Sequence, residues 1–244
     1  MNQLTLAVRL ADHADFDNFV AGDNAAAVAA ARSLAQAPGA PALWLWGAPS
    51  TGRTHLLQAA CAAAGRAGHE AAYLPLAEWR DAGAGALAGW ERYRLLCVDD
   101  VEAIAADEAF ELALFSLFNA LVERGGSLLC AAAAAPAACG LALPDLVSRL
   151  GSGAVFRLEP LDESARLQAL TLRCRRRGMT LPDETLGWLS RRYPRDLTSL
   201  FALLDTLDTE SLTAKRRLTV PFVRSVLRRH GAADGEHEHD EERA

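Results

Sequence analysis

The stretch that decides the fold is Gly47-Ala48-Pro49-Ser50-Thr51-Gly52-Arg53-Thr54, which is followed by His55. It fits the phosphate-loop pattern G-x-x-x-x-G-K-[ST] except that arginine replaces lysine. An apolar, strand-like run precedes the loop at residues 42–46, and a helix-like run follows at residues 55–64. Backbone N–H groups of such a turn and of the next helix form a cradle for phosphate. A chance glycine-rich turn would not have both flanks, so we expect these nine residues to bind a nucleotide.

Arg53 changes the chemistry expected of the loop. Lysine is a compact point charge, whereas arginine is a planar fork that neutralises phosphate in a bidentate manner. We expect nucleotide binding to survive the replacement and catalytic placement to suffer from it.

A second motif, Arg94-Leu-Leu-Cys-Val-Asp99-Asp100, runs from apolar residues into two carboxylates. Such a run suits a central parallel strand, and ligands bind at the carboxyl ends of these strands. We expect Asp99 and Thr54 to hold Mg²⁺, if the metal is present, and Asp100 to orient an attacking water. The alternative is an ordinary acidic turn.

The order of the predicted elements indicates an α/β fold. Strands are predicted at residues 42–46, 71–74, 95–98, 127–131 and 155–158, and helices between them indicate a parallel sheet covered on both faces. Asp23 or Asn24 is expected to cap a helix that runs to about Ala37. After Pro160 only helical periods follow, at residues 162–177, 182–192, 197–209 and 221–229. The predicted divisions are a peptide at 1–12, a nucleotide-binding domain at 13–160, a helical lid at 161–230 and a disordered acidic tail at 231–244.

Composition narrows the classes of function. The net charge is −6, and the tail carries six acids and one base, so the rest of the chain is almost neutral. We therefore expect no sequence-specific DNA-binding surface. No apolar run can span a membrane and no secretory signal is visible, which predicts a cytoplasmic protein. Five cysteines without C-x-x-C spacing indicate buried thiols of a reduced protein.

Several ordered motifs resemble the AAA+ region of DnaA, the family of bacterial replication initiators, over roughly residues 13–229. They are the segment from Phe16 to Asn24, the phosphate loop, residues 98–108 and residues 115–121. DnaA proteins continue into a helix-turn-helix domain, whereas this sequence ends at residue 244 and begins with a short peptide. Both departures, and residues 212–223, match the Hda family of DnaA-related regulators. The resemblance implies an AAA+ P-loop core with a parallel sheet flanked by helices and a small all-helical lid.

The resemblance also implies roles for individual residues. Gln3, Leu4 and Leu6 resemble a motif that binds the DNA polymerase III β sliding clamp, and the alternative is an edge strand or a free chain start. Arg149 resembles an arginine finger that acts on a neighbour's nucleotide, and the alternative is a surface pair with Asp145. Arg195 resembles the lid arginine that reaches the nucleotide phosphates. Phe115 and Asn119 share a helix face, and we expect Asn119 to contact the initiator unless it belongs to the core.

The strand end at residues 131–135 carries only alanine, where related proteins place a polar residue. Together with Arg53, this predicts a degenerate ATPase with little or no activity of its own. The expected function is negative regulation of replication initiation: an ADP-bound protein that, with the DNA-loaded clamp, promotes hydrolysis of ATP on DnaA through Arg149. We expect Arg149 at the surface near the C-terminal edge of the sheet, away from the chain's own loop. The clamp would bring the protein to the nucleoid. The sequence does not decide between a monomer and a homo-oligomer. The alternatives are an active AAA+ motor, such as a clamp-loader-like ATPase, and a DNA-binding initiator fragment.

Overall fold

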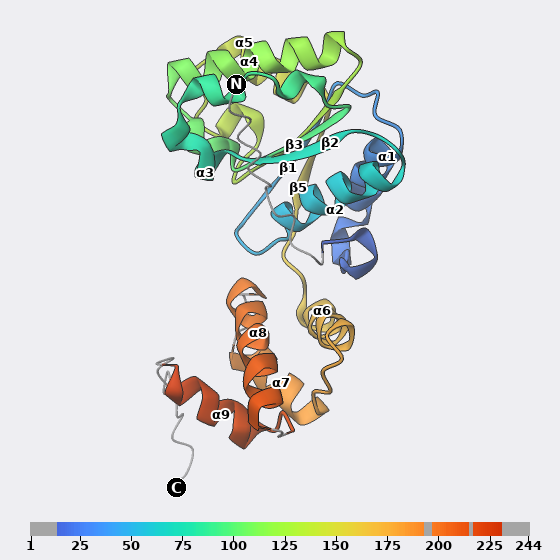
Figure 1. Ribbon diagram of the computed structural model, residues 1–244, viewed down its shortest axis with the longest axis vertical. Helices are drawn as coiled ribbons and strands as arrows, with labels where there is room; N and C mark the ends of the chain where they lie inside the picture. The colour runs from blue at the N-terminus through green and yellow to red at the C-terminus, as the bar shows by residue number, and fades with distance from the viewer. Residues whose placement is uncertain (1–13, 193–196, 215–216, 231–244) are drawn as a thin grey trace, which may run out of the picture. The chain divides into compact units, whose positions relative to one another are not determined.

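Figure 1 shows the computed structural model of the chain, which describes residues 14–192, 197–214 and 217–230. The chain divides into two compact units, Met1–Ala165 and Arg166–Ala244, and each is described by itself.

The first unit is built on a five-stranded parallel sheet with the order β2-β3-β4-β1-β5. Its strands are β1 (Ala42–Gly47), β2 (Ala71–Pro75), β3 (Leu95–Asp99), β4 (Ser127–Ala132) and β5 (Ala154–Leu158). All five predicted strands are confirmed to within one residue at each end. The register aligns Trp44 of β1 with Cys130 of β4 and with Val155 of β5, so the strands end at a common edge.

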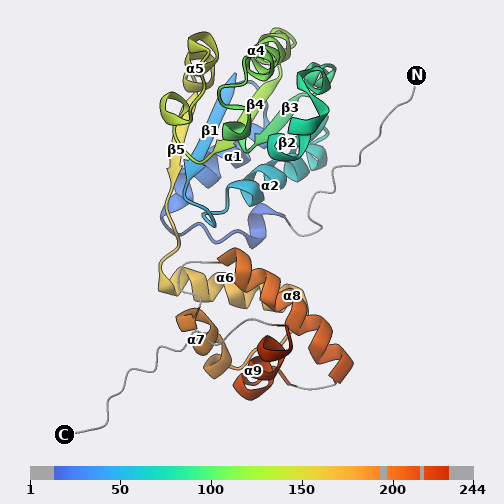
Figure 2. The same cartoon turned by 90° about the vertical axis from the view of Figure 1, so that its left-hand side faces the viewer.

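Helices cover both faces of this sheet, as the two views show (Figures 1 and 2). The α-helices of this unit are α1 (Ala25–Gln36), α2 (Arg53–Arg66), α3 (Leu76–Trp79), α4 (Glu108–Glu123) and α5 (Pro144–Gly151). Short 3₁₀ helices complete the connections: η1 (Phe16–Asn18), η2 (Gly22–Asn24), η3 (Arg80–Ala82), η4 (Ala84–Leu87), η5 (Trp90–Arg92), η6 (Val101–Ile104) and η7 (Pro136–Ala138). The predicted α/β class with a parallel sheet between helical layers is confirmed.

Strand periodicity explains the two cores. Successive side chains of a strand point to opposite faces. In β1, Leu43 and Leu45 join the cluster beneath α1 and α2, whereas Trp44 joins the cluster beneath α4 and α5. All three are buried, which is why this strand carries a continuous apolar run.

Asn24 immediately precedes α1, but its side chain does not cap the helix. Its amide instead donates to the Glu159 carbonyl at 2.9 Å and accepts from the Glu159 N–H at 2.7 Å. The predicted cap is therefore wrong, because this tertiary pairing with the end of β5 satisfies both polar groups of the buried amide.

The second unit contains α7 (Asp183–Arg192), α8 (Leu197–Ala214), α9 (Val220–Arg229) and most of α6 (Glu163–Arg176). Leucines and valines form its core, among them Leu170, Leu189, Leu204 and Val223. The Asp205 carboxylate ties α8 to α6 through Arg173 at 3.0 Å and through Arg177 just beyond α6 at 2.9 Å. The helices predicted for the lid are thus present.

None of the helices in the described part of the chain combines the length and apolar character needed to cross a membrane. The five cysteines are buried free thiols, as predicted. Burial raises the pKa of the Cys61 and Cys174 thiols to about 11.

Candidate nucleotide site

Sheet order brings the two sequence motifs together. The phosphate loop follows β1, the acidic pair ends β3, and β4 lies between these strands. Because all three strands are parallel, the loop, the acidic pair and the segment after β4 meet at one edge of the sheet. The two motifs predicted to share a site are therefore brought to the same place.

Glycine is required at two positions of the loop. A Cβ atom at Gly47 would lie 2.6 Å from the Leu158 carbonyl oxygen. Gly52 has φ +92°, and a Cβ there would lie 2.5 Å from the Phe19 ring. Ser50 also adopts a left-handed conformation, with φ 64°. Glycine thus lets Leu158 and Phe19 pack directly on the loop backbone, and Gly52 supplies the left-handed residue from which α2 begins.

The segment before α1 packs on the loop and on the start of α2. The rings of Phe19 and His55 lie 5.4 Å apart between centroids. The Nε2 atom of His55 lies 3.0 Å from the Asp15 carbonyl oxygen, within hydrogen-bonding distance. His55 thus contacts the N-terminal segment and adds an aromatic surface beside the loop.

Asp99 is buried at the end of β3, and both of its carboxylate oxygens accept hydrogen bonds. The Tyr73 hydroxyl donates to Oδ2 at 2.8 Å, and the backbone N–H of Asp100 donates to Oδ1 at 3.0 Å. Burial, together with the neighbouring Asp99 carboxylate, raises the pKa of Tyr73, so the phenol keeps its proton and remains a donor. The pair fixes the orientation of the carboxylate.

Asp100 has different surroundings. Its φ of 54° is left-handed, and its side chain is only partly buried. Burial raises the pKa of Asp100, the charges of Asp99 and Glu102 raise it further, and Arg53 partly opposes them. Two adjacent carboxylates thus differ in orientation, exposure and hydrogen bonding.

Arg53 points toward an acidic partner from the segment after β3. Its Nη1 atom lies 3.5 Å from Oε1 of Glu102, which belongs to η6. The same Oε1 accepts a hydrogen bond from the Ala133 N–H at 3.0 Å. Glu102 therefore brings a carboxylate to the alanine-rich strand end at which the sequence shows no polar side chain.

The residues at this edge fit a phosphate group. The first turn of α2 has no side-chain cap, and the nearby Arg53 Nη1 is buried without a hydrogen-bond partner. Uncapped N–H groups and an unsatisfied guanidinium are both donors for an anion. Thr54 is exposed at the same helix start, and Asp99 retains unused lone pairs, so this hydroxyl and carboxylate also suit Mg²⁺.

Arg149 lies on a different part of the unit. It is exposed in the last turn of α5, and among the described residues no ion pair joins it to Asp145. It comes shortly before β5, whose first residue, Ala154, pairs with Leu43 near the start of β1. The predicted exposure is thus present, but the expected C-terminal edge of the sheet is wrong. Because α5 returns from the end of β4 to the start of β5, Arg149 lies where the strands begin, whereas the phosphate loop lies where they end.

Glu111 of α4 fixes the start of the helix that carries Arg149. Its carboxylate is buried and accepts hydrogen bonds from three backbone N–H groups: those of Ala106, Ala142 and Leu143. Since Ala142 and Leu143 immediately precede α5, this side chain holds that helix start against α4.

Phe115 and Asn119 are both partly exposed on α4, and Phe115 packs against the core beneath this helix. Leu112 precedes them by three and seven residues, so the three side chains share one helix face. Leu112 is 46 % exposed, so this face presents an apolar side chain to solvent.

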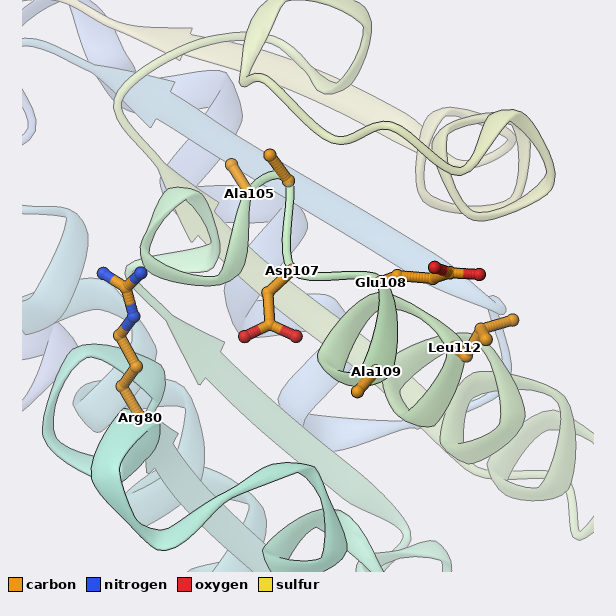
Figure 3. Close-up of a pocket in the computed structure, with 7 residues that line it drawn as sticks. Arg80, Ala105, Asp107, Glu108, Ala109 and Leu112 are labelled. Carbon is orange, nitrogen blue, oxygen red and sulfur yellow. The ribbon is translucent and has the colours of Figure 1, made fainter.

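An open pocket of about 570 Å³ borders the first turn and a half of α4. Figure 3 shows Arg80 of η3 across from Asp107, with Glu108 and Leu112 on the α4 side. The pocket adjoins the face of Phe115 and Asn119 through Leu112, and it contains none of the residues predicted to bind nucleotide.

Four residues with predicted roles lie outside the described part of the chain: Gln3, Leu4 and Leu6 of the N-terminal peptide, and Arg195 near the start of α8. Their roles stay predictions.

Comparisons with known proteins agree with this geometry. The family model described as the Hda lid domain matches residues 162–227, and the bacterial DnaA ATPase domain matches residues 10–77. Domain III of the Thermotoga maritima initiator DnaA superposes with a TM-score of 0.79 at 24% identity, covering 91% of this chain and 98% of that one. The chain is an Hda-like, DnaA-related AAA+ protein.

Other solved structures share the fold of this Hda-like chain. AMPPCP-bound DnaA from Aquifex aeolicus has a TM-score of 0.68 at 22% identity, covering 80% of this chain and 65% of that one. The Thermotoga maritima RuvB branch migration motor has a TM-score of 0.67 at 14% identity, covering 90% and 73%. At these identities the likeness shows an AAA+ fold and leaves activity open.

Sequence reasoning missed two residues of this site, Tyr73 and Glu102. A signal existed for the first, because Tyr73 is a polar-tipped residue in an otherwise apolar strand next to β3. Glu102 follows the acidic pair closely, and nothing local distinguishes it from a solvated glutamate.

Proposed function

We propose that this protein is a negative regulator of replication initiation. It holds ADP, with Mg²⁺ at Thr54 and Asp99, as a structural nucleotide in its own site. On the DNA-loaded sliding clamp it presents Arg149 to ATP bound by DnaA and promotes hydrolysis of that ATP.

The state of the chain's own site is the observation that carries this proposal. The only side-chain cation of its phosphate loop is Arg53, which faces Glu102 at 3.5 Å. Asp99 is buried and engaged through both oxygens. A site whose cation already has an acidic neighbour is suited to holding a nucleotide and poorly suited to stabilising charge that develops during hydrolysis.

Arg149 has the opposite surroundings, since it is exposed and distant along the sheet from the loop. A guanidinium inserted at a neighbour's nucleotide places two parallel donors on phosphoryl oxygens as charge develops there. In comparable NTPases such an arginine accelerates turnover by about 10³–10⁵-fold. An arginine held away from its own nucleotide fits action on another protein's.

The surface of α4 supports contact with a protein partner. Leu112, Phe115 and Asn119 form an exposed face with an apolar centre, and the pocket at Leu112 extends it. Apolar and aromatic side chains on an exposed helix face mark protein interaction sites. This face would contact DnaA, while residues Gln3, Leu4 and Leu6 would contact the clamp as an extended peptide.

The test is the rate of ATP hydrolysis by DnaA, measured with this protein and clamp-loaded DNA. The parent protein should stimulate hydrolysis, and Arg149→Ala should lose nearly all stimulation while it folds and binds ADP normally. Arg149→Lys should recover little, because a point charge does not reproduce the fork. Arg124→Ala is a matched control, since Arg124 is exposed and precedes the start of β4 at the same edge of the sheet.

Two results would contradict this function. Stimulation by Arg149→Ala equal to that of the parent would exclude Arg149 as the finger. Partner-free hydrolysis at enzyme-like rates, about 1–10³ s⁻¹, would favour an autonomous AAA+ motor instead.

A further inference from the structure

The contact between Arg53 and Glu102 lies at the centre of the nucleotide site. Arg53 belongs to the first turn of α2, and Glu102 belongs to η6 directly after the acidic pair. Both side chains are mostly buried, with exposed fractions of 15% and 32%. An ion pair in this position determines which charges the site presents to a nucleotide.

The pair is loose and incompletely satisfied. The separation of 3.5 Å exceeds the 2.7–2.9 Å of a strong charge-assisted hydrogen bond. Arg53 Nη1 and Glu102 Oε2 are both buried without a hydrogen-bond partner. Buried polar atoms are normally paired, so both groups retain unused hydrogen-bonding capacity. A better acceptor could therefore draw Arg53 away from Glu102.

Glu102 itself is held in place by a second contact. Its Oε1 atom accepts from the Ala133 N–H just after β4. Because β4 lies between β1 and β3, this anchor places the carboxylate between the phosphate loop and the acidic pair. The glutamate stays at the site when Arg53 moves.

The balance of charge changes with the number of phosphates. Asp99, Asp100 and Glu102 are three acidic groups at this edge, and Arg53 is the side-chain cation among them. In the phosphate-loop motif, backbone N–H groups cradle the α- and β-phosphates, and the cation at this position reaches the β- and γ-phosphates, so the γ-phosphate depends on the cation. Compared with the α- and β-phosphates, a third phosphate therefore depends more on Arg53 and lies closer to the carboxylates.

We propose that Glu102 determines nucleotide specificity by pairing with Arg53, so that the site takes a nucleoside diphosphate in preference to a triphosphate. The inference rests on the proposed function in that it takes this site to hold a nucleotide. Both phosphates of a diphosphate lie within reach of the loop's backbone N–H groups, so Arg53 can donate from its unused Nη1 without leaving Glu102. A triphosphate must compete with Glu102 for Arg53 and then leaves that carboxylate without a counter-ion.

Glu102→Gln tests this directly. Glutamine keeps the shape and keeps an oxygen for the Ala133 N–H, but it removes the charge that holds Arg53. Affinities for ADP and for the non-hydrolysable analogue AMPPCP are measured by calorimetry on the full chain with Mg²⁺ at fixed salt. AMPPCP should bind about 10-fold more tightly to the variant, as removal of one close like charge allows. ADP affinity should change by less than about 3-fold, because a diphosphate does not have to compete with Glu102 for Arg53.

Two further variants distinguish the Arg53–Glu102 ion pair from a general effect of negative charge on nucleotide binding. Glu78→Gln removes an exposed charge that acts on Asp100 from α3 without contacting Arg53, so its ADP to AMPPCP ratio should match the parent's. The double variant Arg53→Ala/Glu102→Gln should lose the AMPPCP gain, because that gain requires a freed arginine. If Glu102→Gln melts more than a few degrees below the parent, Glu102→Asp replaces it, since the shorter side chain also loosens the pair.

The outcomes are distinguishable. Equal changes in ADP and AMPPCP affinity in Glu102→Gln would overturn the inference and leave Glu102 as a support of the loop. A gain that persists in the double variant, or appears equally in Glu78→Gln, would also overturn it. Tight ADP binding with an unchanged ratio refutes only the role of Glu102. Failure of the parent to bind either nucleotide refutes the proposed nucleotide site as well.

Discussion

Asp99 and Asp100 are adjacent carboxylates with different surroundings, and this difference has measurable consequences. Asp99 is buried and accepts from Tyr73 and from the backbone, whereas Asp100 is partly exposed in a left-handed conformation. A raised pKa in the folded state means that folding favours the protonated form of Asp100. Its ionisation therefore works against folding at neutral pH.

Replacement of Asp100 by asparagine should raise the melting temperature at pH 7 in the absence of nucleotide. Asparagine tolerates the left-handed conformation and removes the charge. A carboxyl with a raised folded pKa contributes its stability at low pH and loses it as the pH rises through that value. The difference between variant and parent should thus shrink as the pH falls toward the ordinary value of 3.8. Calorimetric melting between pH 7 and pH 5 measures this, and a difference that grows on acidification would contradict it.

Replacement of Tyr73 by phenylalanine removes the donor to Asp99 while keeping the ring in the core. A hydrogen bond to a charged group contributes about 1.5–3 kcal/mol, and we expect a loss of that size in urea unfolding. Tyr93→Phe is a useful control, because its hydroxyl belongs to a partly exposed residue and accepts from the exposed Arg92. Equal losses of unfolding free energy in the two variants would show that the Tyr73–Asp99 hydrogen bond stabilises the protein no more than the exposed Tyr93–Arg92 hydrogen bond.

At the scale of elements, one buried carboxylate links α4 to the start of α5 in addition to the apolar core that both helices share. Glu111 accepts from three backbone N–H groups, two of them directly before α5. Because the donors are backbone N–H groups, these hydrogen bonds do not depend on the side chains of Ala142 and Leu143. The position of Arg149 in the last turn of α5 therefore depends on a residue of α4.

Glu111→Ala should destabilise the first unit by at least about 3 kcal/mol, because three backbone N–H groups lose a charged acceptor and each such bond contributes about 1.5–3 kcal/mol. Glu108→Ala is a matched control on the same helix, since Glu108 is exposed one turn earlier, and it should change stability by less than about 0.5 kcal/mol. Urea unfolding followed by circular dichroism gives both values. Similar losses in the two variants would mean that the start of α5 is held by other contacts.

Local patterns predict the elements well and their cross-connections poorly. The five strands and the lid helices follow from apolar periodicity and from glycine and proline positions, which are properties of short windows. The pairings of Tyr73 with Asp99, Arg53 with Glu102 and Asn24 with Glu159 join residues that are distant in the sequence. Only the folded chain reveals them, and for Asn24 the tertiary pairing overrides the local preference of asparagine for helix caps.

At the scale of the whole molecule, predicted functions are separated into different parts of the chain. The phosphate loop, the acidic pair and Arg149 belong to one unit, whereas the helices matched by the Hda lid model form most of the other. The predicted clamp peptide, residues 1–12, is the N-terminal end of the chain. Separate parts allow one function to be removed without unfolding the rest.

The double substitution Gln3→Ala/Leu4→Ala should abolish retention of the protein by immobilised sliding clamp. Nucleotide affinity and melting temperature should stay at the parent's values, since the peptide supplies its side chains to the partner. Thr5→Ala is the control, because the intervening position of the Gln-Leu-x-Leu pattern carries no assigned contact. Undiminished retention of the double variant would exclude this peptide as the clamp-binding element.

The pairing of Asn24 with Glu159 has a consequence for synthesis on the ribosome. These residues are 135 positions apart, and β5, which ends at Leu158, is the last of the five strands of the sheet to be made. At about 5–20 residues per second, roughly 7–27 s separate the emergence of the two partners. The segment that packs its Phe19 ring on the phosphate loop is therefore not secured to β5 until the whole sheet has been translated. Nucleotide binding should therefore begin late in translation, after synthesis of the α/β unit is complete.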